Sequence, residues 1–202
     1  VLHYLRKTRD GLYTVGVDLD PRARERCVHR MDEYHEYDLE QYLQYKDQSW
    51  GKRQYDCIIA ADFLEHVKDP WGVVGVLRDL LAPGGCLVVS IPNIRNIANL
   101  FHVTVLGEWK YHAHSKDEWR GPQDNVLAID HLRFFTKEAV ERLFTDAGYV
   151  IEEWGATYLG APQLEGWTSD LAALVAKYGG DANAWGEQSH VIQWLVRARL
   201  AT

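Results

Sequence analysis

The stretch Tyr55–Pro70, "YDCIIAADFLEHVKDP", changes sharply from apolar to polar residues. Its first half is a run of small apolar side chains, a pattern typical of a strand buried on both faces of a parallel sheet. The run is followed by acidic residues and His66, and Asp69 and Pro70 then give the N-cap and first-turn signals of a helix. Because loops after strand ends often carry binding and catalytic residues, this loop is the first candidate for a functional site.

The remaining sequence alternates between expected strands and helices. Strands are expected over residues 12–19, 34–38, 55–61, 86–91, 149–156 and 190–200, and helices over residues 1–10, 21–31, 70–81 and 137–147. This alternation predicts an α/β fold with a doubly wound sheet. Three of the strands end in an acidic residue, namely Asp18, Asp38 and Asp62. Ligands bind outside the carboxyl ends of the strands in such sheets, so these acids are candidates for a ligand site.

Composition limits the classes of function. The chain of 202 residues has a net charge of -7, which argues against nucleic acid as a partner. No apolar run approaches the roughly 20 residues that a membrane-spanning helix needs, so no membrane partner is expected. The three cysteines are widely spaced without a CxxC motif, and we expect reduced thiols in a cytoplasmic protein. His112-x-His114 lacks further ligands at recognised spacing, and no metal site is expected.

Two longer segments carry a resemblance to a known family. Tyr55–Asn93, with its "LEH", "PGG" and "IPN" pieces, resembles the central block of class I S-adenosylmethionine-dependent methyltransferases. Asp130–Trp154, "DHLRFFTKEAVERLFTDAGYVIEEW", resembles the segment that follows in the small-molecule branch of that family. The pieces occur in family order over about residues 1–156. The resemblance implies a Rossmann-like sheet that is mostly parallel with an antiparallel last strand, and S-adenosyl-L-methionine as cofactor.

One feature of the family has no counterpart in this sequence. The family's glycine-rich loop follows the first strand, and residues 1–10 match the helix that comes after that loop. We interpret residues 1–202 as a single methyltransferase domain that is truncated at its N-terminus and therefore lacks the first strand of a longer protein. The alternative is a degenerate domain that no longer binds cofactor and serves as a binding or scaffold module. A Rossmann oxidoreductase with a nucleotide cofactor would also place acid after its second strand, but "LEH…PGG…IPN" is not its pattern.

The resemblance assigns cofactor contacts to the three strand ends. The carboxylate of Asp18 would accept hydrogen bonds from the ribose hydroxyls, and that of Asp38 from the adenine amine, with an apolar neighbour packed on the ring. Capping of a helix remains the alternative for Asp18, and a solvated acid the alternative for Asp38. The expected cofactor-binding residues are Asp18, Leu19, Asp38, Leu39, Ala61, Asp62 and Phe63.

Two histidines are candidate catalytic residues. We favour His131 over His66 as the base that removes a proton from the acceptor, because the segment that contains His131 lies on the acceptor side in the family. A structural histidine remains the alternative for each. We interpret Glu65 as structural, because adjacent residues cannot face one direction on a regular element. Arg133 would bind a substrate anion or form an ion pair, and Asp130 would orient His131.

Two insertions complete the expected domain. Residues 93–130 are rich in aromatic residues, which favours an acceptor lid, with a separate small core or a homodimer interface as alternatives. Residues 157–189 form a second insertion of unassigned role. We predict a methyltransferase that acts on a small-molecule acceptor through O-methylation. Neither a metal nor a nucleophilic cysteine is expected, since the sulfonium is already a good leaving group.

Overall fold

The computed structural model describes residues 2–45, 48–107, 131–158 and 162–201. It divides into two compact units, Val1–Gln54 and Tyr55–Thr202, and each is described by itself. None of the described helices has both the length and the apolar character needed to cross a bilayer. The expected aromatic lid falls mostly on residues 108–130, which lie outside the described residues.

The N-terminal unit is a small α/β arrangement around two parallel strands. Its elements are α1 (Leu2–Thr8), β1 (Val15–Asp18), α2 (Pro21–Cys27), β2 (Glu33–Glu36) and α3 (Leu39–Tyr45), with 3-10 turns at Val28–Arg30 and Trp50–Lys52. Strands β1 and β2 pair in parallel, with Asp18 opposite Glu36. The carboxyl ends of both strands therefore lie at the same edge of this two-stranded sheet.

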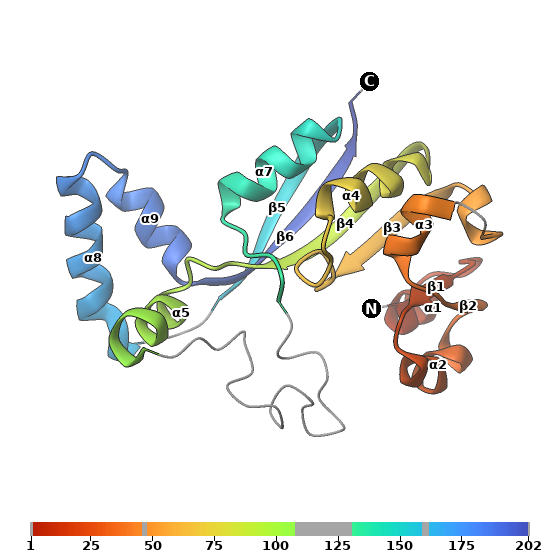
Figure 1. The fold of residues 1–202 in the computed structure, drawn as a ribbon, viewed down its shortest axis with the longest axis horizontal. Helices are drawn as coiled ribbons and strands as arrows, with labels where there is room; N and C mark the ends of the chain where they lie inside the picture. Colours follow the sequence, from red (N-terminus) through yellow and green to blue (C-terminus); the bar gives the residue numbers. More distant parts are fainter. Residues whose placement is uncertain (1, 46–47, 108–130, 159–161, 202) are drawn as a thin grey trace. The chain divides into compact units, whose positions relative to one another are not determined.

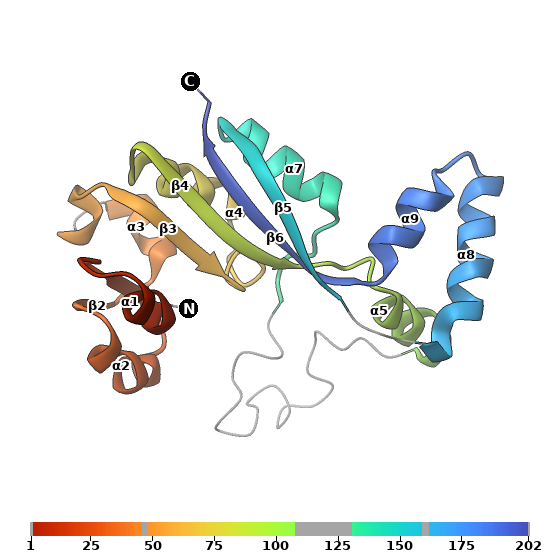
Figure 2. The same ribbon diagram turned by 180° about the vertical axis from the view of Figure 1, so that it is seen from behind.

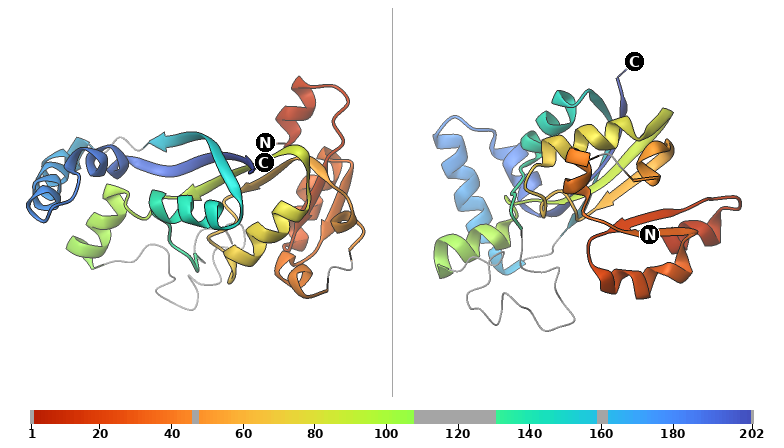
Figure 3. Two further views of the ribbon diagram at one scale, coloured as in Figure 1. Left: turned by 90° about the horizontal axis from the view of Figure 1, so that it is seen from above. Right: turned by 45° about the vertical axis from the view of Figure 1, so that its right-hand side comes forward.

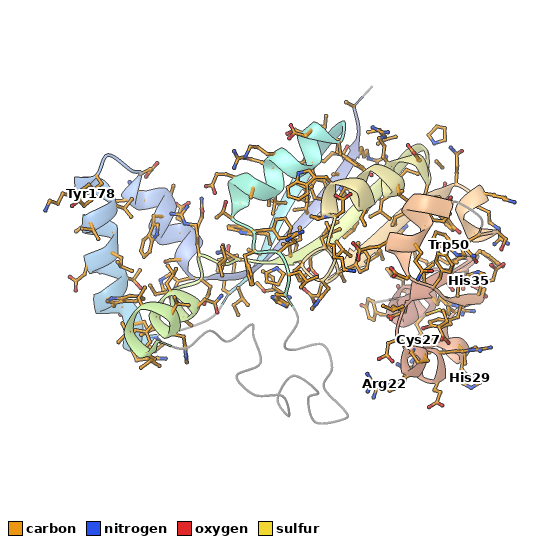
Figure 4. The ribbon with its side chains drawn as sticks, viewed as in Figure 1. Arg22, Cys27, His29, His35, Trp50 and Tyr178 are labelled. Carbon is orange, nitrogen blue, oxygen red and sulfur yellow. The ribbon has the colours of Figure 1, made fainter. Side chains whose placement is uncertain are left out.

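Local chemistry explains the elements of the N-terminal unit. The side chain of Asp20 caps α2 by accepting a hydrogen bond from the backbone N–H of Arg22 at 3.0 Å. Trp50 is only 2% exposed and forms the centre of a small aromatic core. Its ring lies 4.7 Å from that of Tyr42, and the ring of His35 is also near (Figure 4).

The C-terminal unit contains a four-stranded sheet and five described α-helices. Its strands are β3 (Tyr55–Ala61), β4 (Leu81–Pro92), β5 (Tyr149–Tyr158) and β6 (Val191–Leu200). Its helices are α4 (Pro70–Asp79), α5 (Ile97–Phe101) with a π-helical turn at His102–Leu106, α7 (Lys137–Asp146), α8 (Glu165–Lys177) after a 3-10 turn at Pro162–Leu164, and α9 (Ala182–Ser189).

The strand order of this sheet confirms the expected fold class. The order is β3-β4-β6-β5; β3 and β4 are parallel, and the last strand, β6, is antiparallel to both of its neighbours (Figure 1). Among the described strands none joins β1 to β3, so the strands form two sheets rather than one. Strand β3 is thus an edge strand of its sheet. Only Ala60 in it is buried, which is less burial than the apolar run predicted.

Helices α4 and α7 lie on one face of the four-stranded sheet, and the opposite face of the sheet is seen in Figure 2. The core lies between these helices and the sheet. Its fully buried side chains include Val73 and Val74 of α4, Val140 and Phe144 of α7, and Leu87 and Ile91 of β4. Burial of each such side chain contributes roughly 1.5–3 kcal/mol to folding, so this layer holds the strand ends in place.

The expected insertion at residues 157–189 is largely helical. Helices α8 and α9 form an antiparallel hairpin beside α5 (Figure 3), and the three share a small core around Ile97, Leu164 and Trp185. Tyr178, at the tip of the hairpin, is 78% exposed (Figure 4). The hairpin has its own apolar core, as is expected of an elaboration on an α/β domain.

Candidate functional site

The loop after β3 begins with a strained residue. Asp62 has a φ of 48°, and it is the only non-glycine residue in the described parts of the chain with positive φ. Its backbone N–H donates to the carbonyl and the hydroxyl of Ser90 at 3.2 and 2.9 Å. Its Oδ1 accepts hydrogen bonds from the Ser90 hydroxyl at 3.1 Å and from the Gln193 amide at 2.6 Å. Residues in this conformation cluster at functional sites, where the surrounding structure holds them.

Three further side chains converge a few residues beyond Asp62. Glu65 and His66 lie in a turn, and His131 lies in the extended segment before α7. The rings of His66 and His131 are 4.8 Å apart in an edge-on arrangement. Nε2 of His66 lies 3.9 Å from Oε1 of Glu65. One nitrogen or oxygen atom from each of the three side chains lies within 4.8 Å of the other two.

Backbone hydrogen bonds hold this cluster together across the sequence. The N–H groups of Leu132 and Arg133 both donate to the carbonyl oxygen of Glu65, at 2.7 and 3.0 Å. Farther along the same segment, Phe135 forms a parallel bridge with Asn93 at the end of β4. The segment that carries His131 is therefore fixed both to the loop after β3 and to the end of β4.

The electrostatics of the cluster are dominated by burial. Glu65 is 1% exposed, and neither of its carboxyl oxygens has a hydrogen-bond partner among the described residues. Burial raises the pKa of Glu65 to about 8, and the charge of Asp62 raises it further. Burial lowers the pKa of His131 to about 4, and the neighbouring His66 lowers it further. Near neutral pH, Glu65 is thus mostly protonated and His131 neutral, so the contact of Glu65 with His66 is not a full ion pair.

The structure alters the sequence-based interpretation of this cluster. The argument that adjacent residues cannot face one direction does not apply to Glu65 and His66, because residues 64–66 form a turn. Glu65 lies beside both candidate histidines instead of apart from them. His66 and His131, treated as alternatives from the sequence, belong to one cluster.

The structure shows bonds of Arg133 to the backbone, and the two roles that the sequence suggested for it stay predictions. Its guanidinium donates to the carbonyl oxygen of Lys68, from Nε at 3.1 Å and from Nη2, and to the carbonyl of Leu132. These bonds connect the segment of His131 to the start of α4. Asp130, His112 and His114 lie outside the described residues.

The expected cofactor residues of the N-terminal unit lie at one sheet edge. Oδ1 of Asp18 accepts a hydrogen bond from the N–H of Asp20 at 2.8 Å, and Oδ1 of Asp38 accepts one from the N–H of Glu40 at 2.8 Å. Each carboxylate retains further acceptor capacity, since two oxygens offer about four lone-pair sites. These acceptors suit the hydroxyls of a ribose and an exocyclic amine, which would donate to them, so the residues present fit a nucleoside cofactor.

The other expected cofactor residues belong to the C-terminal unit, where they follow β3. Ala61 and Asp62 are exposed, and Phe63 is half-buried. In the N-terminal unit, Leu19 is 65% exposed and Leu39 is half-buried. Within each unit, the exposure of these residues is consistent with contacts to a cofactor. Their assignment as cofactor-binding residues stays a prediction.

Two residues that support the site were missed from the sequence. Ser90 and Gln193 hold Asp62, and each is a single polar residue within an apolar run of its strand. That signal was available in the "CLVVSIPN" and "HVIQWLV" segments. It could not indicate that both residues bind Asp62, because they are more than 100 positions apart and their strands come together only in the fold.

A doubly wound sheet with acids at the carboxyl ends of its strands defines a class of α/β proteins that bind a nucleoside-containing cofactor. Residues 1–153 match the family described as "Methyltransferase domain". The chain therefore belongs to the class I S-adenosylmethionine-dependent methyltransferase family, as the sequence resemblance predicted. S-Adenosylmethionine is the cofactor of this family.

Known proteins agree with this assignment. The chain is 24% identical over 152 residues to a ubiquinone biosynthesis O-methyltransferase of Aeromonas salmonicida, an alignment that covers 74% of this chain and 59% of the relative. It is 31% identical over 100 residues to the protein of the same name from Psychrobacter arcticus, covering 50% of this chain and 35% of the relative. The chain thus spans little more than half of the first relative and about a third of the second.

A solved structure supports the fold. The crystal structure of a SAM-dependent methyltransferase from Archaeoglobus fulgidus matches with a TM-score of 0.56 and 13% identity. The match covers 96% of this chain and 79% of the solved one. At this identity, the likeness is evidence for the shared architecture alone.

Proposed function

We propose that this protein transfers the methyl group of S-adenosylmethionine to a hydroxyl oxygen of a small-molecule acceptor. The observation that carries the proposal is the Glu65–His66–His131 cluster, which follows β3 at the carboxyl end of the sheet. Ligands bind at this end in doubly wound sheets. The names of the two curated relatives support oxygen as the methylated atom.

The proposed reaction divides the work between two sets of residues. S-Adenosylmethionine, when bound, supplies a methyl group on a sulfonium, which is already a good leaving group. Asp18 and Asp38 hold and orient the nucleoside part of the cofactor through their carboxylates. The protein must also align the acceptor oxygen with the methyl group and let its proton leave. We assign the removal of this proton to the cluster. Within the cluster, we expect proton removal to depend most on His131.

Product analysis tests the reaction class. The protein is incubated with S-adenosylmethionine that carries a deuterated methyl group and with matched pairs of phenolic and amine compounds. We expect the label on oxygen of at least one phenolic or alcoholic acceptor, located by mass spectrometry and NMR. Label found on nitrogen or carbon would contradict O-methylation. Cofactor binding without turnover on any acceptor would favour a binding module instead.

A substitution tests the role of the cluster. We expect His131→Ala to lower turnover by about 10²–10⁴-fold, the range for loss of an acid–base group. Affinity for the cofactor should stay near that of the wild type, since the nucleoside contacts are assigned to other residues. His190→Ala is the matched control, because this half-buried histidine caps the end of α9 instead of joining the cluster. Full turnover by His131→Ala would overturn the assignment.

A further inference from the structure

We infer that Glu65, His66 and His131 bind a divalent transition-metal ion, with Zn²⁺ as the best match to their chemistry. The inference rests on the proposed function for the role of the ion, which is to activate the acceptor hydroxyl. It reverses the expectation, drawn from the sequence, that the reaction uses no metal. Among the described residues, these three form a group whose potential ligand atoms lie close enough together to hold a metal ion.

The geometry of the cluster is close to that of a metal site. Its three ligand atoms lie within 4.8 Å of one another, and the separation between His66 Nε2 and Glu65 Oε1 is 3.9 Å. Bonds of about 2.0–2.2 Å to a common ion place ligand atoms roughly 3.0–3.6 Å apart. Rotations of the side chains that close the cluster by about an ångström would complete the site. The backbone needs no such change, because Leu132 and Arg133 already tie it to Glu65.

The carboxyl group of Glu65 provides an independent reason to expect a ligand. It is almost completely buried, and neither oxygen has a hydrogen-bond partner among the described residues. A buried polar group normally finds a partner, and a buried carboxylate pairs with a cation or coordinates a metal. The indole N–H of Trp194 is also buried without a hydrogen-bond partner among the described residues, but an N–H donor cannot bind a cation. Glu65 is therefore the buried, unpaired group that a metal ion would satisfy.

The ligand set indicates which ion would bind. Two imidazoles and one carboxylate suit Zn²⁺, Fe²⁺ or Co²⁺ better than Mg²⁺ or Ca²⁺, which prefer oxygen ligands alone. Three protein ligands also leave a coordination position open, as catalytic zinc sites do. The neighbouring carboxylate of Asp62 is occupied by Ser90 and Gln193, so it is not counted among the ligands.

The open position gives the ion a role in the proposed reaction. A divalent ion lowers the pKa of a hydroxyl that reaches it, so the O–H proton leaves to water near neutral pH. The bond between that oxygen and the methyl carbon then forms while the bond between methyl carbon and sulfur breaks. The electron pair stays on sulfur, and the products are the methyl ether and neutral S-adenosylhomocysteine.

Metal titration of the untagged chain tests the inference. After treatment with a chelator and dialysis, Zn²⁺ binding is measured by calorimetry, and Co²⁺ binding by the visible absorption of the bound ion. We expect about one ion per chain. Glu65→Gln, His66→Ala and His131→Ala should each weaken binding by at least about tenfold. Circular dichroism and thermal melting establish that each variant is folded.

Two controls separate this site from others. His190→Ala should bind metal like the wild type, since His190 lies outside the cluster. The double variant His112→Ala/His114→Ala should also bind normally if the cluster holds the ion. Loss of binding in that variant, with normal binding in the three cluster variants, would overturn the inference.

The outcomes for the metal site and for the proposed function are distinguishable. Absence of stoichiometric Zn²⁺ and Co²⁺ binding, together with an O-methylated product, would overturn the metal site and leave O-methylation in place. One bound ion that is lost in the cluster variants, without any O-methylated product, would support the site and contradict the proposed function.

Discussion

At the scale of single residues, local signals in the sequence were reliable. Asp69 was predicted as an N-cap, and its side chain accepts a hydrogen bond from a backbone N–H in the first turn of α4. Asp20 and Thr136 cap α2 and α7 in the same way. A cap depends only on its neighbours in sequence, so its chemistry can be read without knowledge of the fold. The contact between His66 and His131 is different. It joins positions 65 apart and depends on a turn whose side-chain directions the sequence did not indicate.

Asp62 allows a prediction at the same scale. Asp and Asn tolerate positive φ better than other non-glycine residues, and a β-branched residue there is strongly disfavoured. Asp62→Val should reduce the free energy of unfolding by roughly 1–3 kcal/mol, because it adds backbone strain and removes the bonds to Ser90 and Gln193. Asp62→Asn should cost less, since an amide oxygen can still accept from Ser90. Urea unfolding of both variants measures the difference, and equal stabilities would contradict the proposed strain.

At the scale of elements, the type of each element was predicted better than its ends. Strand β3 has the predicted bounds, whereas β4 begins at Leu81 instead of Cys86. Residues 82–85 were expected to connect a helix to the strand that begins at Cys86, but Leu81 already pairs with Tyr55, and the pairing resumes at Cys86 with Cys57. The extra residues form a bulge in which Gly84 has a φ of 76°. A bulge depends on the partner strand, so the sequence of β4 alone could not indicate it.

The N-cap of α4 gives a prediction at this scale. The side chain of Asp69 accepts a hydrogen bond from the N–H of Gly72 at 3.0 Å. Asp69→Ala should therefore lower the free energy of unfolding by about 0.5–2 kcal/mol. Asp79→Ala is the matched control on the same helix, because Asp79 is exposed near its C-terminal end and caps nothing there. Chemical denaturation compares the two, and a loss of stability no larger for Asp69→Ala than for Asp79→Ala would show that the cap contributes little.

At the scale of the whole molecule, the family resemblance predicted a strand direction that hydrophobic periodicity alone could not predict. Alternation of strands and helices predicts a doubly wound sheet, but it does not give the antiparallel direction of β6 or its place between β4 and β5. The antiparallel direction of the last strand came from the family pattern and is confirmed. Its place between β4 and β5 was not predicted and is known from the structure. The division of the strands into two sheets also divides the expected cofactor-binding residues. The expected cofactor residues fall partly in Val1–Gln54 and partly in Tyr55–Thr202.

That division makes Asp18 the informative residue for cofactor binding. It lies in the N-terminal unit, at the end of β1, while the Glu65–His66–His131 cluster lies in the C-terminal unit. Asp18→Ala should weaken binding of S-adenosylmethionine by roughly 1–3 kcal/mol, because ribose hydroxyls would lose a charged acceptor. Isothermal titration calorimetry measures the loss. Asp10→Ala is the control, since Asp10 is an exposed acid of the same unit that is not at a strand end.

A second variant separates the cofactor contact from a structural role. Oδ1 of Asp18 already accepts a hydrogen bond from the N–H of Asp20, so Asp18→Ala could also disturb the entry to α2. An amide oxygen preserves that bond, whereas the amide NH₂ cannot accept from a ribose hydroxyl. Asp18→Asn should therefore retain wild-type stability in urea and still bind the cofactor more weakly. Unchanged affinity in both variants would remove Asp18 from the site. Weaker binding in Asp18→Ala alone, accompanied by lower stability, would assign the residue to the turn before α2.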